Sequence, residues 1–345
     1  GEQPPDRSRG GASLLPGLRQ PRCNANSSSA IAIRLAVVRA LVQSFAPPPG
    51  LIADLQAAVA DLRRPAGCRS GLLRLALLLL LLAMGAWLYW GLQAWPWRLV
   101  GLLVISLAET LLLIASHEAG HGTLLGQRRL ERVLALLIGW PMAWPSGSYR
   151  LLHALHHRWN GCDLRDPEQV RLRSPGLLWR LCACGGLGLV VRAYSEAWRL
   201  RGVQPRLGSA LLVDVLGVAL LQLLILWIAL QQQLLVPYLL SWLVVERLAG
   251  AALQLRGAIE HWQLGQPYGH PLLTQLYSSR TVDVPVWLSW WLGGLPHHSV
   301  HHAFPTLPTD SLPLATARVE AVLRRHGWPP LPRSNGYGEA LALLA

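Results

Sequence analysis

Histidines are unevenly distributed along this 345-residue chain, and eight of the twelve fall into three short sets. Residues three or four positions apart share one face of a helix, so the imidazoles of each set can bind one metal ion together. Adjacent histidines diverge by roughly 100° around a helix, so such a pair can reach two different ions. The sets are His117 and His121; His153, His156 and His157; and His298, His301 and His302.

The number of clustered imidazoles limits the choice of metal. A tetrahedral zinc site needs four ligands, whereas two iron ions of higher coordination number can use eight or nine nitrogen ligands. A ninth candidate, His261, lies at the end of a long apolar segment. We therefore predict two iron ions bound by the three sets together with His261, and ordinary core or surface positions for His270, His297 and His326.

Three acidic residues lie close in sequence to these histidines. A carboxylate that accepts the N–H of a ligating imidazole fixes the tautomer and the orientation of the ring. Glu118 lies inside the first set, Asp166 follows the second set, and Glu260 precedes His261. We expect Glu118 and Glu260 to act in catalysis in this way; the alternative is that these acids are solvated groups at helix ends.

Four long apolar segments are available to position the histidines. The chain is 52% hydrophobic and only 14% charged, where a typical soluble protein is about one quarter charged. A helix needs about 20 apolar residues to cross the hydrocarbon core of a bilayer. Segments of that kind occupy positions 72–92, 97–115, 210–230 and 234–253. The short links within each pair predict an all-α integral membrane protein with four transmembrane helices in two hairpins.

Arginine indicates the orientation of these helices, because positive residues stay on the cytoplasmic side of a membrane. The turns at 93–96 and 231–233 contain no arginine, whereas the stretch between the two hairpins contains many. We therefore expect both termini and a histidine-rich helical cap on the cytoplasmic side. Two shorter apolar stretches, 133–144 and 176–191, are broken by proline, glycine or arginine and are expected to be interfacial or re-entrant.

Composition divides the chain into three regions. Residues 1–70, rich in Pro, Ser, Gly and Arg, are expected to form a poorly ordered cytoplasmic region, with an organellar transit peptide as the alternative. Residues 71–328 form the expected membrane domain, and 329–345 a C-terminal tail. Five scattered cysteines show no disulfide or zinc-ribbon spacing. The net charge of +13 comes entirely from arginine, as in many proteins of GC-rich genomes, and does not favour nucleic acid as a partner.

The three histidine sets, in this order and with this layout of apolar segments, resemble the membrane fatty acid desaturase superfamily, which includes acyl and sphingolipid desaturases and carotenoid hydroxylases and ketolases. The resemblance covers residues 70–328 and is strongest around the three sets, at Asp166 and Pro167, and at 256–261. It departs from the family at Pro296, near the place where members carry Asn or Gln. The resemblance implies a non-haem diiron site that uses molecular oxygen and two electrons to oxidise an unactivated C–H bond.

The same resemblance implies a long apolar substrate that reaches the iron ions from the bilayer. Residues 256–261 and the segment 303–308 after the third set favour fatty acyl desaturation, and carotenoid hydroxylation or ketolation is the alternative. No haem-binding or ferredoxin-like domain is recognised in these residues, so we expect electrons from a separate donor such as ferredoxin. An arginine-rich cytoplasmic face would attract an acidic donor electrostatically.

Two other interpretations of the histidines are less favoured. The segment from His117 to His121 also matches the H-E-x-x-H signature of zinc metalloproteases, in which Glu118 would be the general base. That interpretation leaves the other clustered histidines without a role. A membrane haem protein would place single histidines inside facing spans, and the four apolar segments contain none.

Overall fold

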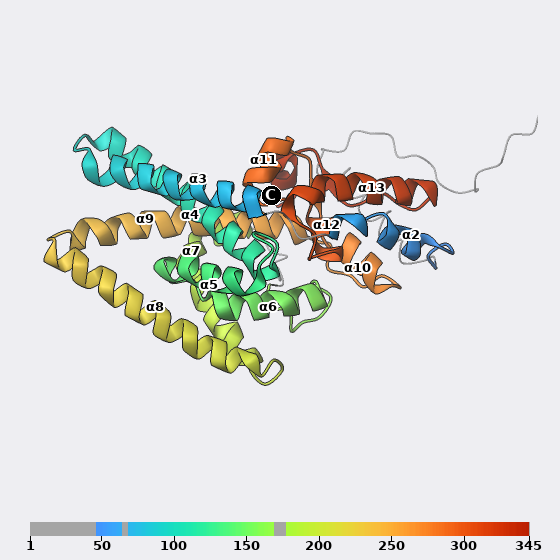
Figure 1. Ribbon diagram of the computed structural model, residues 1–345, viewed down its shortest axis with the longest axis horizontal. Helices are drawn as coiled ribbons and strands as arrows, with labels where there is room; N and C mark the ends of the chain where they lie inside the picture. Colours follow the sequence, from blue (N-terminus) through green and yellow to red (C-terminus); the bar gives the residue numbers. More distant parts are fainter. Residues whose placement is uncertain (1–45, 64–67, 169–176, 345) are drawn as a thin grey trace, which may run out of the picture.

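The computed structural model describes residues 46–63, 68–168 and 177–344, and these residues are mostly helical. Long helices extend toward one end of an elongated molecule, and short helices occupy the other end (Figure 1). Residues 1–45 of the expected N-terminal region lie outside the described residues. The histidine-bearing segments lie near the middle, where the long and the short helices meet.

Four helices are long and apolar enough to cross a membrane. Each overlaps one of the segments predicted from the sequence, and two of them run on to end at His121 and His261. They are α3 (Cys68–Ala86), which continues into the π-helical turn η2 (Trp87–Gly91), α4 (Trp95–His121), α8 (Arg206–Gln231) and α9 (Leu235–His261).

The long helices pack unequally. α3 lies beside α4, and a Cβ atom at Gly85 would lie only 2.9 Å from the backbone nitrogen of Ile105, so glycine permits the close approach. α9 packs against α4, whereas α8 diverges from α9 beyond their connecting turn (Figure 1). Most side chains of α8 are exposed, and most of the exposed ones are apolar, a surface that suits lipid better than water.

Shorter helices lie between these pairs. α5 (Arg128–Gly139) leads through the 3-10 turn η3 (Trp140–Met142) to α6 (Ser146–Trp159), and α7 (Leu177–Leu200) packs along α9. α7 bends at Gly185, whose φ of 58° favours glycine. The predicted stretches 133–144 and 176–191 fall largely in α5–η3 and α7, and neither is among the candidate membrane spans of the described residues.

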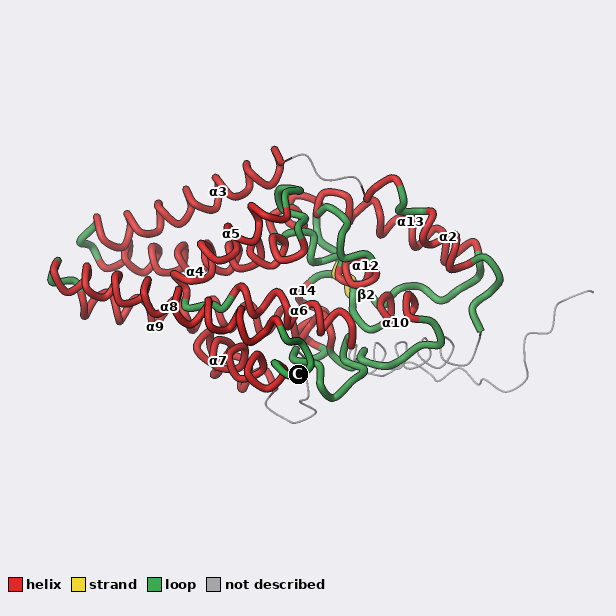
Figure 2. Tube along the Cα trace, turned by 60° about the horizontal axis from the view of Figure 1, so that its bottom comes forward, coloured by secondary structure: helices red, strands yellow, loops and turns green. Residues whose placement is uncertain are grey.

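The C-terminal part of the described chain consists of short elements. β1 pairs in parallel with β2, with Thr281 opposite Arg333, and ties the end of the chain to the segment before α12 (Figure 2). The elements are α10 (Pro271–Tyr277), β1 (Thr281–Val282), α11 (Val286–Trp291), α12 (His298–Ala303), η4 (Thr309–Ser311), α13 (Leu312–Arg325), β2 (Arg333–Ser334) and α14 (Tyr337–Ala342).

Part of the region expected to be loose is folded. α2 (Leu51–Ala57) and η1 (Asp61–Arg63) precede the first long helix, and α2 packs against α13. Leu51, Leu55 and Val59 are fully buried in the core that α13 shares. These residues are spaced four apart and so form one apolar stripe. The expectation of a poorly ordered segment up to residue 70 is therefore wrong for 51–63, and β2 and α14 likewise give the tail regular structure.

Candidate metal centre

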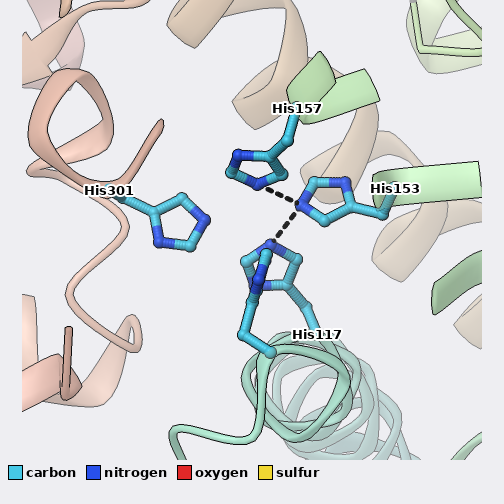
Figure 3. A group of neighbouring side chains, drawn as sticks. His117, His153, His157 and His301 are labelled. Carbon is cyan, nitrogen blue, oxygen red and sulfur yellow. Dashed lines mark hydrogen bonds between the residues drawn. The ribbon is translucent and has the colours of Figure 1, made fainter. Parts of the chain in front are cut away.

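Four helices bring the nine predicted histidines to one place. The C-terminal turns of α4 and α9, the second half of α6, and α12 carry them. The rings of His117, His153, His157 and His301 point toward a common centre from three of these helices (Figure 3). The structure thus gathers residues from positions 117 to 302 of the chain.

The imidazoles form two adjoining groups. Within each group, the nitrogens that could bind a metal ion all lie within 4.8 Å of one another. The adjacent pairs in the second and third sets are each divided between the two groups. We call them the five-histidine cluster (His117, His121, His153, His157 and His301) and the three-histidine cluster (His156, His261 and His302). His298 joins the second cluster through its contact with His261, whose Nε2 lies 3.0 Å away.

The spacing of the ring nitrogens fits metal ions. Nε2 of His153 lies 2.8 Å from Nε2 of His117 and 3.0 Å from Nε2 of His157. Two nitrogens at right angles around an ion, each at about 2.1 Å from it, are separated by about 3 Å. Nε2 of His121 and Nε2 of His301 are buried and have no hydrogen-bond partner among the described residues. A bound ion would satisfy buried polar atoms of this kind.

The protonation of these rings also suits a metal, because only an unprotonated ring nitrogen binds one. Burial, together with the neighbouring imidazoles, lowers the pKa of several of these histidines well below the ordinary value, so their rings are neutral near pH 7. This holds outside the long apolar helices for His157, His298, His301 and His302.

Two carboxylates orient rings of the second set. Nδ1 of His153 lies 2.6 Å from Oε1 of Glu168, and Nδ1 of His156 lies 2.9 Å from Oδ1 of Asp166. Each contact directs the opposite nitrogen, Nε2, toward the centre. Burial alone would lower the pKa of His156, but Asp166 and Glu168 raise this pKa to about 9. Metal binding at His156 would therefore displace a proton.

Glu168 was not predicted from the sequence. The residue lies two positions after Asp166, and a second acid in this short stretch was the available signal. Burial raises the pKa of Glu168, but the adjacent His153 and His156 outweigh burial and bring the pKa below its usual range. Glu168 is therefore an ionised acceptor at the edge of the five-histidine cluster.

The two acids predicted to act in catalysis have different surroundings. Glu260 lies at the centre: Oε2 is 3.3 Å from Nε2 of His298, and both carboxylate oxygens accept hydrogen bonds of 2.8 Å from Arg256. Glu118 is buried, but the hydrogen-bond partners of its carboxylate among the described residues are Arg74 and Thr309 rather than a histidine.

The contacts of Glu118 correct the expectation that it orients a histidine ring. Neighbouring residues diverge by roughly 100° around a helix, so Glu118 leaves α4 on a different face from His117. That face meets α3 through Arg74 and η4 through Thr309. Glu118 therefore connects three elements beside the metal centre and does not contact its imidazoles.

The three remaining histidines lie outside the clusters, as expected. His326 contacts Asp54 of α2 at 2.9 Å. His270 accepts the backbone N–H of Leu272 at the start of α10. His297 forms an isolated bridge with Thr281 before α12. Each contact stabilises a local structure.

A cavity of about 390 Å³ opens beside the histidines, between α4, α6, α7 and α9. This volume is within the range of small-molecule sites. His117 and His261 both line the cavity, so a ligand there reaches both imidazole clusters. The other lining residues are of mixed character and include Leu113, Leu189, Leu253, Glu168, Arg192 and Gln254.

Comparisons with known proteins agree with this centre. Residues 93–333, more than half of the chain, match the family model described as fatty acid desaturase. An acyl-lipid (9-3)-desaturase of Physcomitrium patens is 36% identical over 53 residues, which are 15% of this chain and 10% of that protein. A delta(8)-fatty-acid desaturase of Euglena gracilis is 29% identical over 106 residues, 28% of this chain and 25% of that protein. The matches thus span a quarter or less of the length of these relatives.

Proposed function

Because this chain belongs to the fatty acid desaturase family, we propose that it desaturates the fatty acyl chain of a membrane lipid at a centre of two iron ions. The observation that carries the proposal is the convergence of nine imidazoles from four helices on one buried site. Membership of the family makes the chain an oxidoreductase. Imidazole nitrogens are ligands that suit iron.

The two clusters divide the ligands between the ions. The five-histidine cluster would hold one ion, and the three-histidine cluster with His298 would hold the other. When bound, iron supplies the activation of molecular oxygen. The balanced reaction converts a –CH2–CH2– unit, O2, two electrons and two protons into a –CH=CH– unit and two waters.

Residues around the imidazoles prepare them for this role. Glu168 and Asp166 hold the Nδ1 protons, so the Nε2 atoms face the centre as the ligand atoms, at His156 after loss of its second proton. Arg256 clamps Glu260 through both oxygens and so keeps that carboxylate beside His298. The cavity at His117 and His261 would hold the reacting part of the acyl chain, with Leu113, Leu189 and Leu253 as its apolar contacts.

The membrane arrangement that we propose is two hairpins, α3 with α4 and α8 with α9. The metal centre and both termini would lie on the cytoplasmic side. Two features support this orientation. The links after η2 and after α8 contain no arginine, whereas exposed arginines follow the histidine-bearing end of α4. These include Arg128, Arg129 and Arg132.

Electrons would come from a separate acidic protein such as ferredoxin. Exposed arginines lie at the start of α5, at the end of α6 and in the loop after α6, close in sequence to the clustered histidines; they include Arg129, Arg158 and Arg165. A positive face of this kind accelerates the encounter with an acidic partner, and added salt weakens the effect.

The alternatives have less support. One relative is named as an acyl-lipid desaturase and the other as a fatty-acid desaturase, which favours an acyl substrate over a carotenoid. A zinc metalloprotease would use Glu118 as general base. The ion pair of Glu118 with Arg74 and its contact with Thr309 direct it away from the imidazoles.

Expression in a host that supplies ferredoxin and its reductase tests the substrate. Fatty acids and carotenoids are profiled together, for the wild type and for His301→Ala as a matched inactive control. We expect new unsaturated fatty acids with the wild type and none with the variant. Oxidised carotenoids with an unchanged fatty acid profile would instead favour a hydroxylase or ketolase.

A further inference from the structure

A buried carboxylate in α8 contacts the start of the helix that carries the second histidine set. Asp214 is fully buried and accepts four hydrogen bonds from outside its own helix. The donors are Trp140 Nε1 at 3.1 Å, Gly147 N at 3.2 Å, Ser148 N at 2.7 Å and Ser148 Oγ at 2.8 Å. An acidic group is costly in an apolar helix and is kept only where it has partners. These hydrogen bonds therefore make Asp214 a structural link between α8 and the start of α6.

The first turn of α6 needs an acceptor from elsewhere in the chain. N–H groups in the first turn of a helix have no partner within that helix. Pro145, which precedes α6, provides no side-chain cap. A carboxylate satisfies such donors and is attracted by the positive end of the helix dipole. Asp214 therefore caps α6 from a different helix.

Packing on either side of Asp214 fixes where α6 meets α8. A Cβ atom at Gly217 would lie 2.5 Å from the ring of Trp140, so only glycine allows the ring to seat on α8. Gln222 donates hydrogen bonds to the carbonyl oxygens of Trp140 and Pro141, at 3.1 and 2.8 Å. The segment that leads into α6 is thus held along α8.

α6 carries His153, His156 and His157, and the nearest of them, His153, lies five residues after Ser148. A short helix moves as one unit, so the place of its first turn sets the direction of these rings. We infer that Asp214 is a positioning residue for the metal centre, which acts by fixing the first turn of α6. The inference rests on the proposed function, since the centre is the one proposed there.

α9 offers a matched control. Glu246 is also a buried carboxylate in a long apolar helix, and it accepts the backbone N–H of Leu187 at 2.9 Å, just after the bend in α7. α7 carries none of the nine clustered histidines, and His261 lies 15 positions after Glu246, at the far end of α9. Loss of the Glu246 carboxylate should lower stability without displacing α6.

The experiment compares Asp214→Asn, Ser148→Ala and Glu246→Gln in the full chain. Iron affinity, the Mössbauer spectrum of the iron-loaded protein, and amide hydrogen exchange of α6 in the metal-free protein are measured. Asp214→Asn places an amide against the N–H donors of α6. We expect this variant to weaken iron binding about tenfold, the lower end of the range for residues that support metal ligands. Its spectrum should change, and exchange in α6 should rise.

Ser148→Ala removes one of the four hydrogen bonds and should move the same three quantities in the same direction by less. Glu246→Gln should leave all three at wild-type values. Unchanged iron binding and α6 exchange in Asp214→Asn and Ser148→Ala would overturn the inference. Equal changes in Glu246→Gln would also overturn it, since they would indicate a general loss of stability.

Two further outcomes can be distinguished from failure of the inference. If Asp214→Asn does not accumulate, the comparison of Ser148→Ala with Glu246→Gln decides the question by the same criteria. If the wild type binds no iron, the proposed function fails, and α6 exchange in the metal-free variants still tests whether Asp214 holds the helix.

Discussion

His157 lies where the two imidazole clusters meet. Its Nε2 is 3.0 Å from Nε2 of His153, and its ring stacks on that of His302 with the centroids 4.2 Å apart. Gln275 donates a hydrogen bond to the His157 carbonyl and fixes the backbone there. The side chain is thus held between the clusters, and no neighbour can take its place.

Replacement of His157 by Ala should therefore abolish desaturation, because it removes a nitrogen ligand from the five-histidine cluster. His326→Ala is the matched control: His326 contacts Asp54 far from the centre, and this variant should retain most of its activity. Product yield and protein level are measured together, since loss of a ligand can also unfold a metal-dependent site. A His157→Ala variant that accumulates normally and keeps more than about a tenth of its yield would exclude His157 as a ligand.

Glu168 provides a test of ligand orientation. Glu168→Gln removes the charge that holds Nδ1 of His153, and we expect iron affinity to fall roughly tenfold to a hundredfold. Asp163→Asn, in the same loop, loses only an ion pair with Arg165 and should bind iron like the wild type. Equal iron affinities for the two variants, measured by competition with a chelator, would contradict the role of Glu168.

At this scale the sequence predicted which histidines come together, and their binding of metal stays a prediction. Of the three acids named from the sequence, Asp166 and Glu260 lie beside histidines and Glu118 does not. The spacing of His153, His156 and His157 is a property of one helix, so the local sequence contains the information. The contact of Glu168 with His153 depends on how a loop folds back on α6, and the contact of Glu118 with Arg74 depends on how α3 packs on α4. Such contacts between separate elements leave no pattern in a single sequence.

Helix length allows α4 and α9 to deliver histidines to a site beside the membrane, as the proposed topology requires. Each has 27 residues and extends about 40 Å at 1.5 Å per residue. The hydrocarbon core is roughly 30 Å thick, so about two turns of each helix can stand beyond it. His117, His121 and His261 all lie in these last turns.

The packing of α2 on α13 makes a separate prediction about stability. Leu55 is fully buried in this contact, so Leu55→Ala should lower the free energy of unfolding by about 2–5 kcal/mol. Leu314→Ala, at an exposed position of α13, should change it by about 0.5 kcal/mol or less. Urea unfolding in detergent measures both, and equal effects would show that α2 does not belong to the core.

Sequence reasoning found the long helices and missed this short one. The four apolar segments are identified by length and hydropathy alone, which depend on no tertiary contact. α2 has only seven residues and follows a run of prolines, and its burial depends on a partner more than 250 positions away. The pairing of β1 with β2 likewise involves two residues in each strand, too few for a recognisable pattern.

On the scale of the whole molecule, the turn between α8 and α9 lies at one end of the long axis, and His261 ends α9 in the opposite direction (Figure 1). We predict that the turn at Gln232 and the loop at Gly126 lie on opposite sides of the membrane. Single cysteines placed at these positions, in an active variant without native cysteines, are labelled in intact cells with an impermeant reagent. Labelling of both from the same side would contradict the proposed hairpins.

The central claim is that the gathered imidazoles bind two iron ions. Metal analysis of protein purified after expression in iron-replete medium tests it most directly, because it depends neither on the substrate nor on the electron donor. We predict about two irons per chain, in keeping with the two clusters. One zinc per chain without iron would contradict the diiron centre and favour the zinc metalloprotease interpretation of the H-E-x-x-H segment at His117.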